Sequence, residues 1–158
     1  MFFSKGKVVN SIKQEGRVYI FRFTLEDGTL VWKVGMTNSD RATDRMFEVL
    51  RSFFNTYRYS PKCELKRDKK VLIPGLVEKH LHRLLEDWSH KFNKPFGGST
   101  EFFHNLDEAV LLDYLDNFEY KDLLKDQVTI KETDYALIKN AINTQVPQPS
   151  LELDEIPF

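Results

Sequence analysis

Glu78 is the acidic residue whose position most favours metal chemistry. It follows Val77, one step off an apolar stripe at helical spacing, so its carboxylate can reach the edge of the packed surface. Carboxylate oxygens suit hard cations such as Mg²⁺ or Mn²⁺. Position alone leaves two interpretations of Glu78: a ligand of such a cation, or an ordinary acid in a first helical turn, where the helix dipole favours negative charge.

Three cationic side chains could meet a phosphate. Arg41 and Arg45 are four residues apart and therefore share one face of a helix. A guanidinium there can bind two phosphate oxygens and stabilise the charge of a transition state. Alternatively, both arginines pair with neighbouring acids such as Asp44. The ammonium of Lys33 can orient or neutralise phosphate, but it cannot accept a proton while charged.

Histidine and cysteine give little support for a zinc site. His80 and His82 are two residues apart, so on a helix they point to different faces. Cys63 is the only cysteine, which excludes an internal disulfide and a thiolate zinc cluster built by this chain alone. We expect Cys63 to be a structural strand residue.

A β-hairpin and a helix are expected to position Lys33 and the arginines. Residues 17–23 and 30–34 are rich in β-branched and aromatic side chains and flank an Asp-Gly turn at 26–29. A helix is predicted over about 39–54, because polar residues able to cap it precede an apolar face at helical spacing. A third strand is predicted within 57–71.

The strongest periodic signal in the second half predicts a helix of about four turns that carries Glu78. Its apolar positions recur at helical spacing from Val77 to Phe92. A loop is expected over 93–99 and a short strand over 100–104. Three further segments complete the prediction: a buried stripe over 106–124, a helix over 134–143 and a flexible tail over 146–158.

The predicted fold is an α/β (α+β) domain with a small central, three-stranded, mostly antiparallel sheet flanked by helices and a C-terminal helical extension. At 158 residues with 41% hydrophobic side chains, the chain is long enough for one domain with its own core. We predict a first domain over 1–105, an acidic helical extension over 106–145 packed on the same domain, and the tail.

The order of the motifs along residues 17–104 resembles the GIY-YIG endonuclease superfamily, in particular its phage-associated branch with a Lys-Ile-Gly second motif. The motifs are Val18-Tyr19-Ile20, Lys33-Val34-Gly35, Arg45, Glu78 and Thr100-Glu101-Phe102-Phe103. The sequence departs from the family in three places: Lys33 replaces the second Tyr, Thr43 stands where the family Arg is usual, and Phe102 replaces Trp.

The resemblance implies a DNA endonuclease that uses one Mg²⁺ or Mn²⁺ on Glu78. It implies that Tyr19 activates or positions the attacking water, and that the backbone at Gly35 approaches closely or turns, which glycine permits. Arg45 is favoured over Arg41, because the residues that follow Arg45 match the family helix better. His82 is expected to contact phosphate or hold Glu78, and Asn93 and Glu101 are further substrate-binding candidates.

Charge is divided unevenly along the chain. Residues 1–100 hold 19 Lys and Arg against 11 Asp and Glu, whereas residues 101–158 hold 4 against 13. A positive half is what DNA would meet, although two solvated faces of different sign would give the same count. The acidic region could dock a protein partner or inhibit the chain by competing with DNA.

Other features bear on location and on the alternative function. No apolar run approaches the roughly 20 residues of a membrane span, and Met1–Lys7 lacks the order of a secretory signal. We expect a cytoplasmic protein of a bacterial or phage-infected cell. The alternative to an enzyme is a weak or inactive module that binds DNA or a protein, and the pattern leaves the target and the oligomeric state open.

Overall fold

The computed structural model describes residues 15–125 and 131–145, which fall into two compact units, Glu15–Asn117 and the chain from Phe118 onward. The predicted tail over 146–158 lies outside the described residues. The boundaries predicted at 105 and 145 stay a prediction, although the first unit runs past 105 and includes α4.

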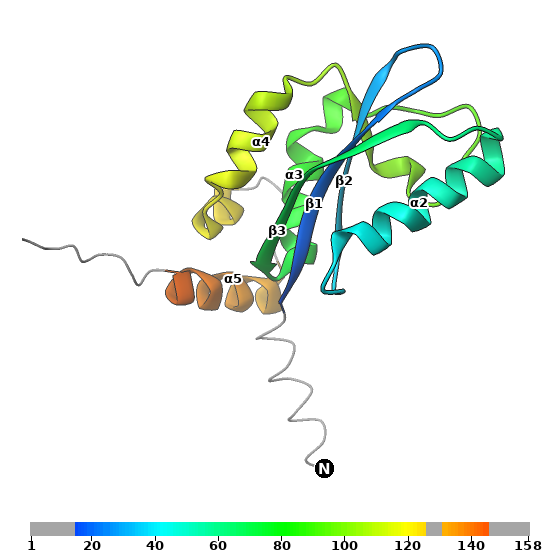
Figure 1. The fold of residues 1–158 in the computed structure, drawn as a ribbon. Helices are drawn as coiled ribbons and strands as arrows, with labels where there is room; N and C mark the ends of the chain where they lie inside the picture. The colour runs from blue at the N-terminus through cyan, green and yellow to red at the C-terminus, as the bar shows by residue number, and fades with distance from the viewer. Residues whose placement is uncertain (1–14, 126–130, 146–158) are drawn as a thin grey trace, which may run out of the picture. The chain divides into compact units, whose positions relative to one another are not determined.

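The first unit contains a four-stranded antiparallel sheet in the order β3-β1-β2-β4 (Figure 1). Its strands are β1 Glu15–Thr24, β2 Leu30–Thr37, β3 Lys62–Leu72 and β4 Phe102–His104. The predicted α/β class is confirmed, but the prediction of three strands is wrong. The fourth strand is β4, whose three residues pair with Val31, Trp32 and Lys33.

The β1–β2 hairpin is as the sequence predicts. Eight residue pairs join the strands, from Arg17↔Thr37 to Thr24↔Leu30. Gly28 in the turn has φ = 89°, a left-handed conformation that glycine adopts without steric cost. This register sets Tyr19 opposite Gly35 and Phe21 opposite Lys33.

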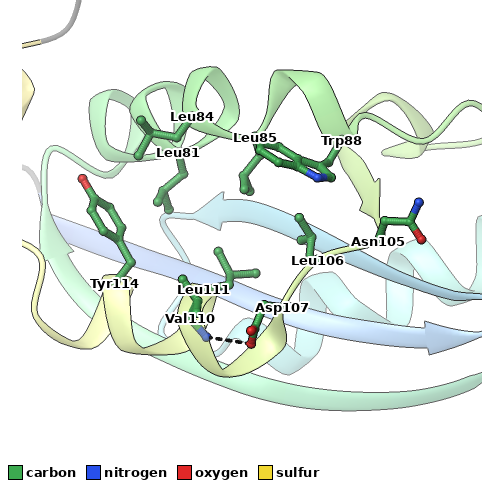
Figure 2. A pocket seen from close by; sticks show the side chains of 10 residues that line it. All are labelled: Leu81, Leu84, Leu85, Trp88, Asn105, Leu106, Asp107, Val110, Leu111 and Tyr114. Carbon is green, nitrogen blue, oxygen red and sulfur yellow. Dashed lines mark hydrogen bonds between the residues drawn. The ribbon is translucent and has the colours of Figure 1, made fainter.

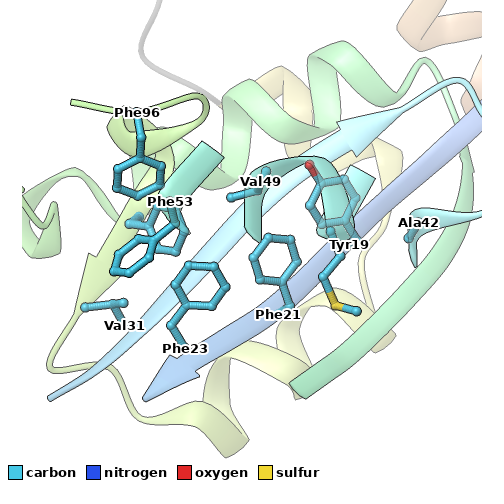
Figure 3. Close-up of a cluster of buried hydrophobic side chains, with 10 residues drawn as sticks. Tyr19, Phe21, Phe23, Val31, Ala42, Val49, Phe53 and Phe96 are labelled. Atoms are coloured by element: carbon cyan, nitrogen blue, oxygen red, sulfur yellow. The ribbon is translucent and has the colours of Figure 1, made fainter. Parts of the chain in front are cut away.

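Helices cover the sheet on both faces. Side chains alternate along β1, so Tyr19, Phe21 and Phe23 share one face and pack against α2, Ala42–Tyr57 (Figure 3). α4, Glu108–Asp116, packs on the other face, while α3, Pro74–Leu84, runs alongside β2 (Figures 1 and 2).

Two predicted helix boundaries are wrong. α2 begins at Ala42 rather than near 39; its N-cap is Arg41, and no side chain caps it. α3 ends at Leu84, and the chain then forms a 3₁₀ turn, Glu86–Trp88, and an isolated antiparallel bridge from Ser89 to Phe103. The apolar residues from Trp88 to Phe92 therefore pack from extended or irregular backbone rather than from a long helix.

The chain after Asn117 forms a 3₁₀ helix, Tyr120–Lys125, and α5, Glu132–Gln145, which contains the helix predicted over 134–143. Leu123, Ile138 and Ala141 are buried, so these helices also have apolar contacts. Within the described ranges, each helix is too short or too polar to cross a bilayer.

Candidate functional site

Glu78 lies in the first turns of α3, where a constrained turn sets the direction of the helix. Ile73 has φ = 44°, a left-handed conformation that a β-branched residue rarely adopts, and Pro74 follows as the first helical residue. The Glu78 side chain is 17% exposed. Its carboxylate is therefore shielded but still open to a ligand from solvent.

Glu78, His82 and Glu101 bring potential metal-binding atoms together. One atom from each side chain lies within 4.8 Å of the others. Burial raises the pKa of Glu78 above its usual value, and the negative charge of Glu101 raises it further, against the opposing effects of His82, Lys33 and Arg45. A carboxylate whose ionisation is disfavoured by burial and by a neighbouring carboxylate fits a cation, which would neutralise the negative charge.

His82 is held by the open part of the β2 edge. β4 pairs with β2 only as far as Lys33, and the next carbonyl, of Val34, lies 2.7 Å from His82 Nε2. Because a carbonyl only accepts hydrogen bonds, Nε2 must carry the proton. Nε2 is also 3.9 Å from Glu78 Oε2. In this arrangement Nε2 cannot bind a metal, so His82 is better suited to position Glu78 than to act as a ligand.

Lys33 is a fully buried cation that pairs with Glu101. Its side chain has 0% exposure, and Nζ donates to Glu101 Oε1, while the Glu101 side chain is 33% exposed. Nζ also lies 5.4 Å from the centre of the Tyr19 ring. Burial lowers the pKa of Lys33, and the charge of Glu101 opposes this effect. The immediate partner of Lys33 is thus a carboxylate of the cluster, not open solvent.

The Tyr19 hydroxyl completes the cluster from β1. Burial raises its pKa to about 12, although the charge and hydrogen bonding of Arg45 act in the opposite direction. Tyr19 therefore stays protonated near neutral pH. Its hydroxyl can donate and accept hydrogen bonds, but it does not provide a phenolate base.

Two glycines make room for these side chains. A Cβ at Gly35 would collide with the Tyr19 hydroxyl and would lie 2.8 Å from Lys33 Nζ. Gly98, with φ = 87°, closes over Lys33, and a Cβ there would lie 3.0 Å from Lys33 Cε. The prediction of a close approach at Gly35 agrees with this geometry. Gly98 was missed, although the Gly97-Gly98 pair in the sequence could have indicated a tight approach.

The two candidate arginines differ in position. Arg45 is 39% exposed, pairs with Glu48 at 2.8 Å, and interacts electrostatically with Tyr19, Lys33 and Glu78. Arg41 is 71% exposed and pairs with Asp44 at 2.9 Å. The structure therefore brings Arg45, but not Arg41, to the cluster.

Asn93 lies apart from the cluster. It is exposed and lines a cavity with residues of the hairpin turn, including Glu26 and Asp27. Tyr19 is five residues up β1 from the end of the strand at Thr24, which corresponds to about 17 Å of extended chain. This position gives no support for a role of Asn93 at the Glu78 cluster.

An apolar cavity of about 400 Å³ lies between α3 and α4 (Figure 2). Its walls come from leucines of α3, from Trp88, and from Val110, Leu111 and Tyr114 of α4. His80 Nε2 contacts the Tyr114 hydroxyl at 2.7 Å, while His82 contacts the β2 edge. The two histidines thus point to different places, as their spacing predicts.

Acidic residues of α4 pair with cations of β3. Arg67 forms two hydrogen bonds to the Asp116 carboxylate, at 2.9 and 3.0 Å, and Lys69 Nζ donates to the carbonyl of Leu115 at 2.7 Å. Lys66 lies 3.4 Å from Glu108. Part of the positive charge predicted to face DNA is therefore neutralised within the unit, and self-inhibition by the acidic region stays a prediction.

The fold and the cluster define an α/β domain that gathers carboxylates, a guanidinium and a protonated tyrosine around strands β1 and β2. The model of the T5orf172 domain family matches residues 16–119, and the chain belongs to that family. No curated protein and no solved structure gives a significant match.

This assignment corrects the resemblance to the GIY-YIG endonucleases. T5orf172 is a different family, although both families occur in phage-associated nucleases. The resemblance depended on short motifs that recur by chance, since aromatic strand residues and Lys-Val-Gly are common, and Lys33, Thr43 and Phe102 already departed from it. The T5orf172 domain family is nuclease-like and DNA-binding, which supports a DNA-related function for this chain.

Proposed function

We propose that this chain is an endonuclease that hydrolyses DNA phosphodiester bonds with one divalent cation, Mg²⁺ or Mn²⁺. The observation that carries this proposal is the convergence of Glu78 and Glu101 beside the Tyr19 hydroxyl, Lys33 and Arg45. The nuclease-like character of the T5orf172 domain family supports this proposal.

The carboxylates of Glu78 and Glu101 are the groups that would hold the cation. Glu101 Oε1 accepts from Lys33, which leaves its second oxygen for another partner. Glu78 lies next to His82, whose protonated Nε2 is fixed on the Val34 carbonyl. When bound, the cation would supply Lewis-acid stabilisation of the phosphate and of the leaving oxygen.

The other residues of the cluster would bind the phosphate and orient the attacking water. The guanidinium of Arg45 is partly exposed, so it can bind the non-bridging oxygens of a phosphate and offset the charge that grows in the transition state. The protonated Tyr19 hydroxyl orients the attacking water without removing its proton. Buried Lys33 acts through Glu101, which it holds in place and whose charge it offsets.

The test compares Glu78→Gln with Glu86→Gln, which removes the same charge from an exposed position outside the cluster. In a plasmid-nicking assay with Mg²⁺, we expect Glu78→Gln to lose about a hundredfold or more in rate, as for removal of one stabilising group from an active site, and to retain DNA binding. Glu86→Gln should cut like the parent. EDTA should stop the parent, and equal cutting by Glu78→Gln would contradict the proposal.

The alternative is a module that binds DNA without turnover. The full burial of Lys33 favours it, because an ammonium held on Glu101 is withdrawn from a phosphate in solvent. This alternative predicts salt-sensitive binding of DNA by the parent with no EDTA-sensitive cleavage in Mg²⁺ or Mn²⁺.

A further inference from the structure

Two histidines outside the Glu78 cluster are fixed on paired backbone. Ser89 bridges to Phe103, and the His90 N–H donates to the Phe102 carbonyl at 2.8 Å. His104 ends β4 and pairs with Val31 of β2. In this antiparallel arrangement His90 and His104 are diagonal neighbours on the same face. Their imidazoles therefore project together from a hydrogen-bonded frame.

The two imidazoles approach each other through their Nδ1 atoms. His90 Nδ1 lies 3.0 Å from His104 Nδ1, with the ring planes at 87° to each other. One Nδ1 must donate and the other accept, so a single proton lies between two nitrogens that are both potential ligands. Both rings are half-buried and line an open cavity of about 620 Å³ together with Thr29 and Trp32.

The surroundings of His90 favour the neutral form of its ring. Burial lowers the pKa of His90, the positive charge of His104 lowers it further, and Asp27 acts in the opposite direction. A neutral imidazole is the form that binds a metal. Asp27 adds a negative charge in the vicinity.

We propose that His90 and His104 chelate a transition-metal ion, Zn²⁺, Ni²⁺ or Cu²⁺, at a second site separate from Glu78. Two nitrogens at about 2.0–2.1 Å from one ion lie about 3.3 Å apart in tetrahedral geometry and about 2.9 Å apart as neighbours in a square plane. The distance of 3.0 Å between the two Nδ1 atoms falls within this range. Both rings must turn so that their Nδ1 atoms, which now point at each other, converge on the ion.

Binding requires no change in the number of protons on the pair. The Nδ1 proton moves to Nε2 of the same ring, so both Nδ1 lone pairs become available. Two imidazoles without a carboxylate suit borderline ions rather than Mg²⁺, which prefers oxygen. The remaining coordination positions face the cavity, where water or an external ligand can occupy them.

The tag-free chain is titrated with Cu²⁺, and tryptophan fluorescence is recorded. Trp32 lines the same cavity, and Trp88 is close in sequence to His90, so a bound Cu²⁺ should quench the emission with one-to-one saturation. His90→Gln and His104→Gln should each weaken Cu²⁺ binding by about tenfold or more. Removal of a residue that only hydrogen-bonds to a metal ligand already costs about that much affinity, and here a ligand itself is removed. Glu78→Gln should bind Cu²⁺ like the parent, which separates this site from the proposed nuclease.

Electron paramagnetic resonance of the Cu²⁺-loaded parent provides a measurement that needs no variant. Hyperfine coupling to two imidazole nitrogens is expected. A spectrum with oxygen ligands alone, quenching that does not saturate, or variants that bind as tightly as the parent would each overturn the proposal.

Discussion

Gly35→Ala tests whether the cluster is packed as closely as the structure indicates. The new methyl group would meet the Tyr19 hydroxyl, the terminal ring carbon of Tyr19 at 2.6 Å and Lys33 Nζ at 2.8 Å. Neither side chain can turn out to solvent, because both have 0% exposure. The strain must therefore be relieved by shifts within the core.

The expected cost follows from the number of contacts that must move. Inserting a methyl group into a packed interior costs about 1–3 kcal/mol. For a chain of this size, each kcal/mol lowers the Tm by about 2–4 °C, so Gly35→Ala should lower it by about 2–12 °C. Displacement of Tyr19 and Lys33 should also reduce any metal-dependent cleavage.

Gly75→Ala is the matched control. A Cβ at Gly75, in the first turn of α3, meets nothing within 4 Å. Alanine is favoured over glycine in a helix, so this variant should be unchanged or more stable by up to about 1 kcal/mol. Thermal unfolding followed by circular dichroism measures both variants. Equal stability of Gly35→Ala and the parent, or equal loss in both variants, would refute the close packing around Tyr19.

Three further outcomes are expected. Arg45→Gln should slow plasmid cleavage by about 10²–10³ while Arg41→Gln changes it little, and the reverse order would exclude Arg45 as the phosphate-binding residue. Burial raises the pKa of Cys63 to about 12, so Ellman's reagent at pH 8 should react slowly with the folded chain and rapidly in denaturant. Burial alone would raise the pKa of Glu108, but the Trp32 hydrogen bond and the charges of Arg22 and Lys66 lower it. The stability that ionised Glu108 contributes is therefore present above about pH 4.5 and is lost as the pH falls through its folded-state pKa. The Glu108→Gln variant should not show this loss when unfolding is measured as a function of pH.

Local sequence signals predicted the hairpin because they act over few residues. The Asp-Gly turn and the flanking aromatic and β-branched residues specify both strands without help from the rest of the chain. The helix predicted up to Phe92 failed for the opposite reason. Phe92 fits the apolar period, but its ring packs on Phe96 and Phe102, and the bridge from Ser89 to Phe103 replaces helical hydrogen bonds. Tertiary pairing here overrides local periodicity.

The candidate site was predictable by residue type but not by partnership. Glu78 and Arg45 carry groups suited to metal and phosphate, and Tyr19 was proposed from the motif order, whereas the pairing of Lys33 with Glu101 joins residues 68 positions apart. Such a contact depends on β4 joining the edge of β2, and the sequence predicts a short strand over 100–104 without indicating its partner strand or its register. The motif order led to the wrong family, since short motifs constrain spacing less than a match over residues 16–119 does.

The ion pairs between β3 and α4 affect how strongly salt should weaken DNA binding. Each phosphate neutralised by a free cation releases condensed counterions, and the logarithm of affinity then falls with the logarithm of salt in proportion to that number. Arg67 already pairs with the Asp116 carboxylate on α4, and Lys66 lies 3.4 Å from that of Glu108, so engaging a phosphate would mean exchanging one anion for another. The slope of log affinity against log salt concentration should therefore be shallower than the excess of basic residues in the first 100 positions implies. Affinity for DNA should then depend more on how the two surfaces fit together than on net charge.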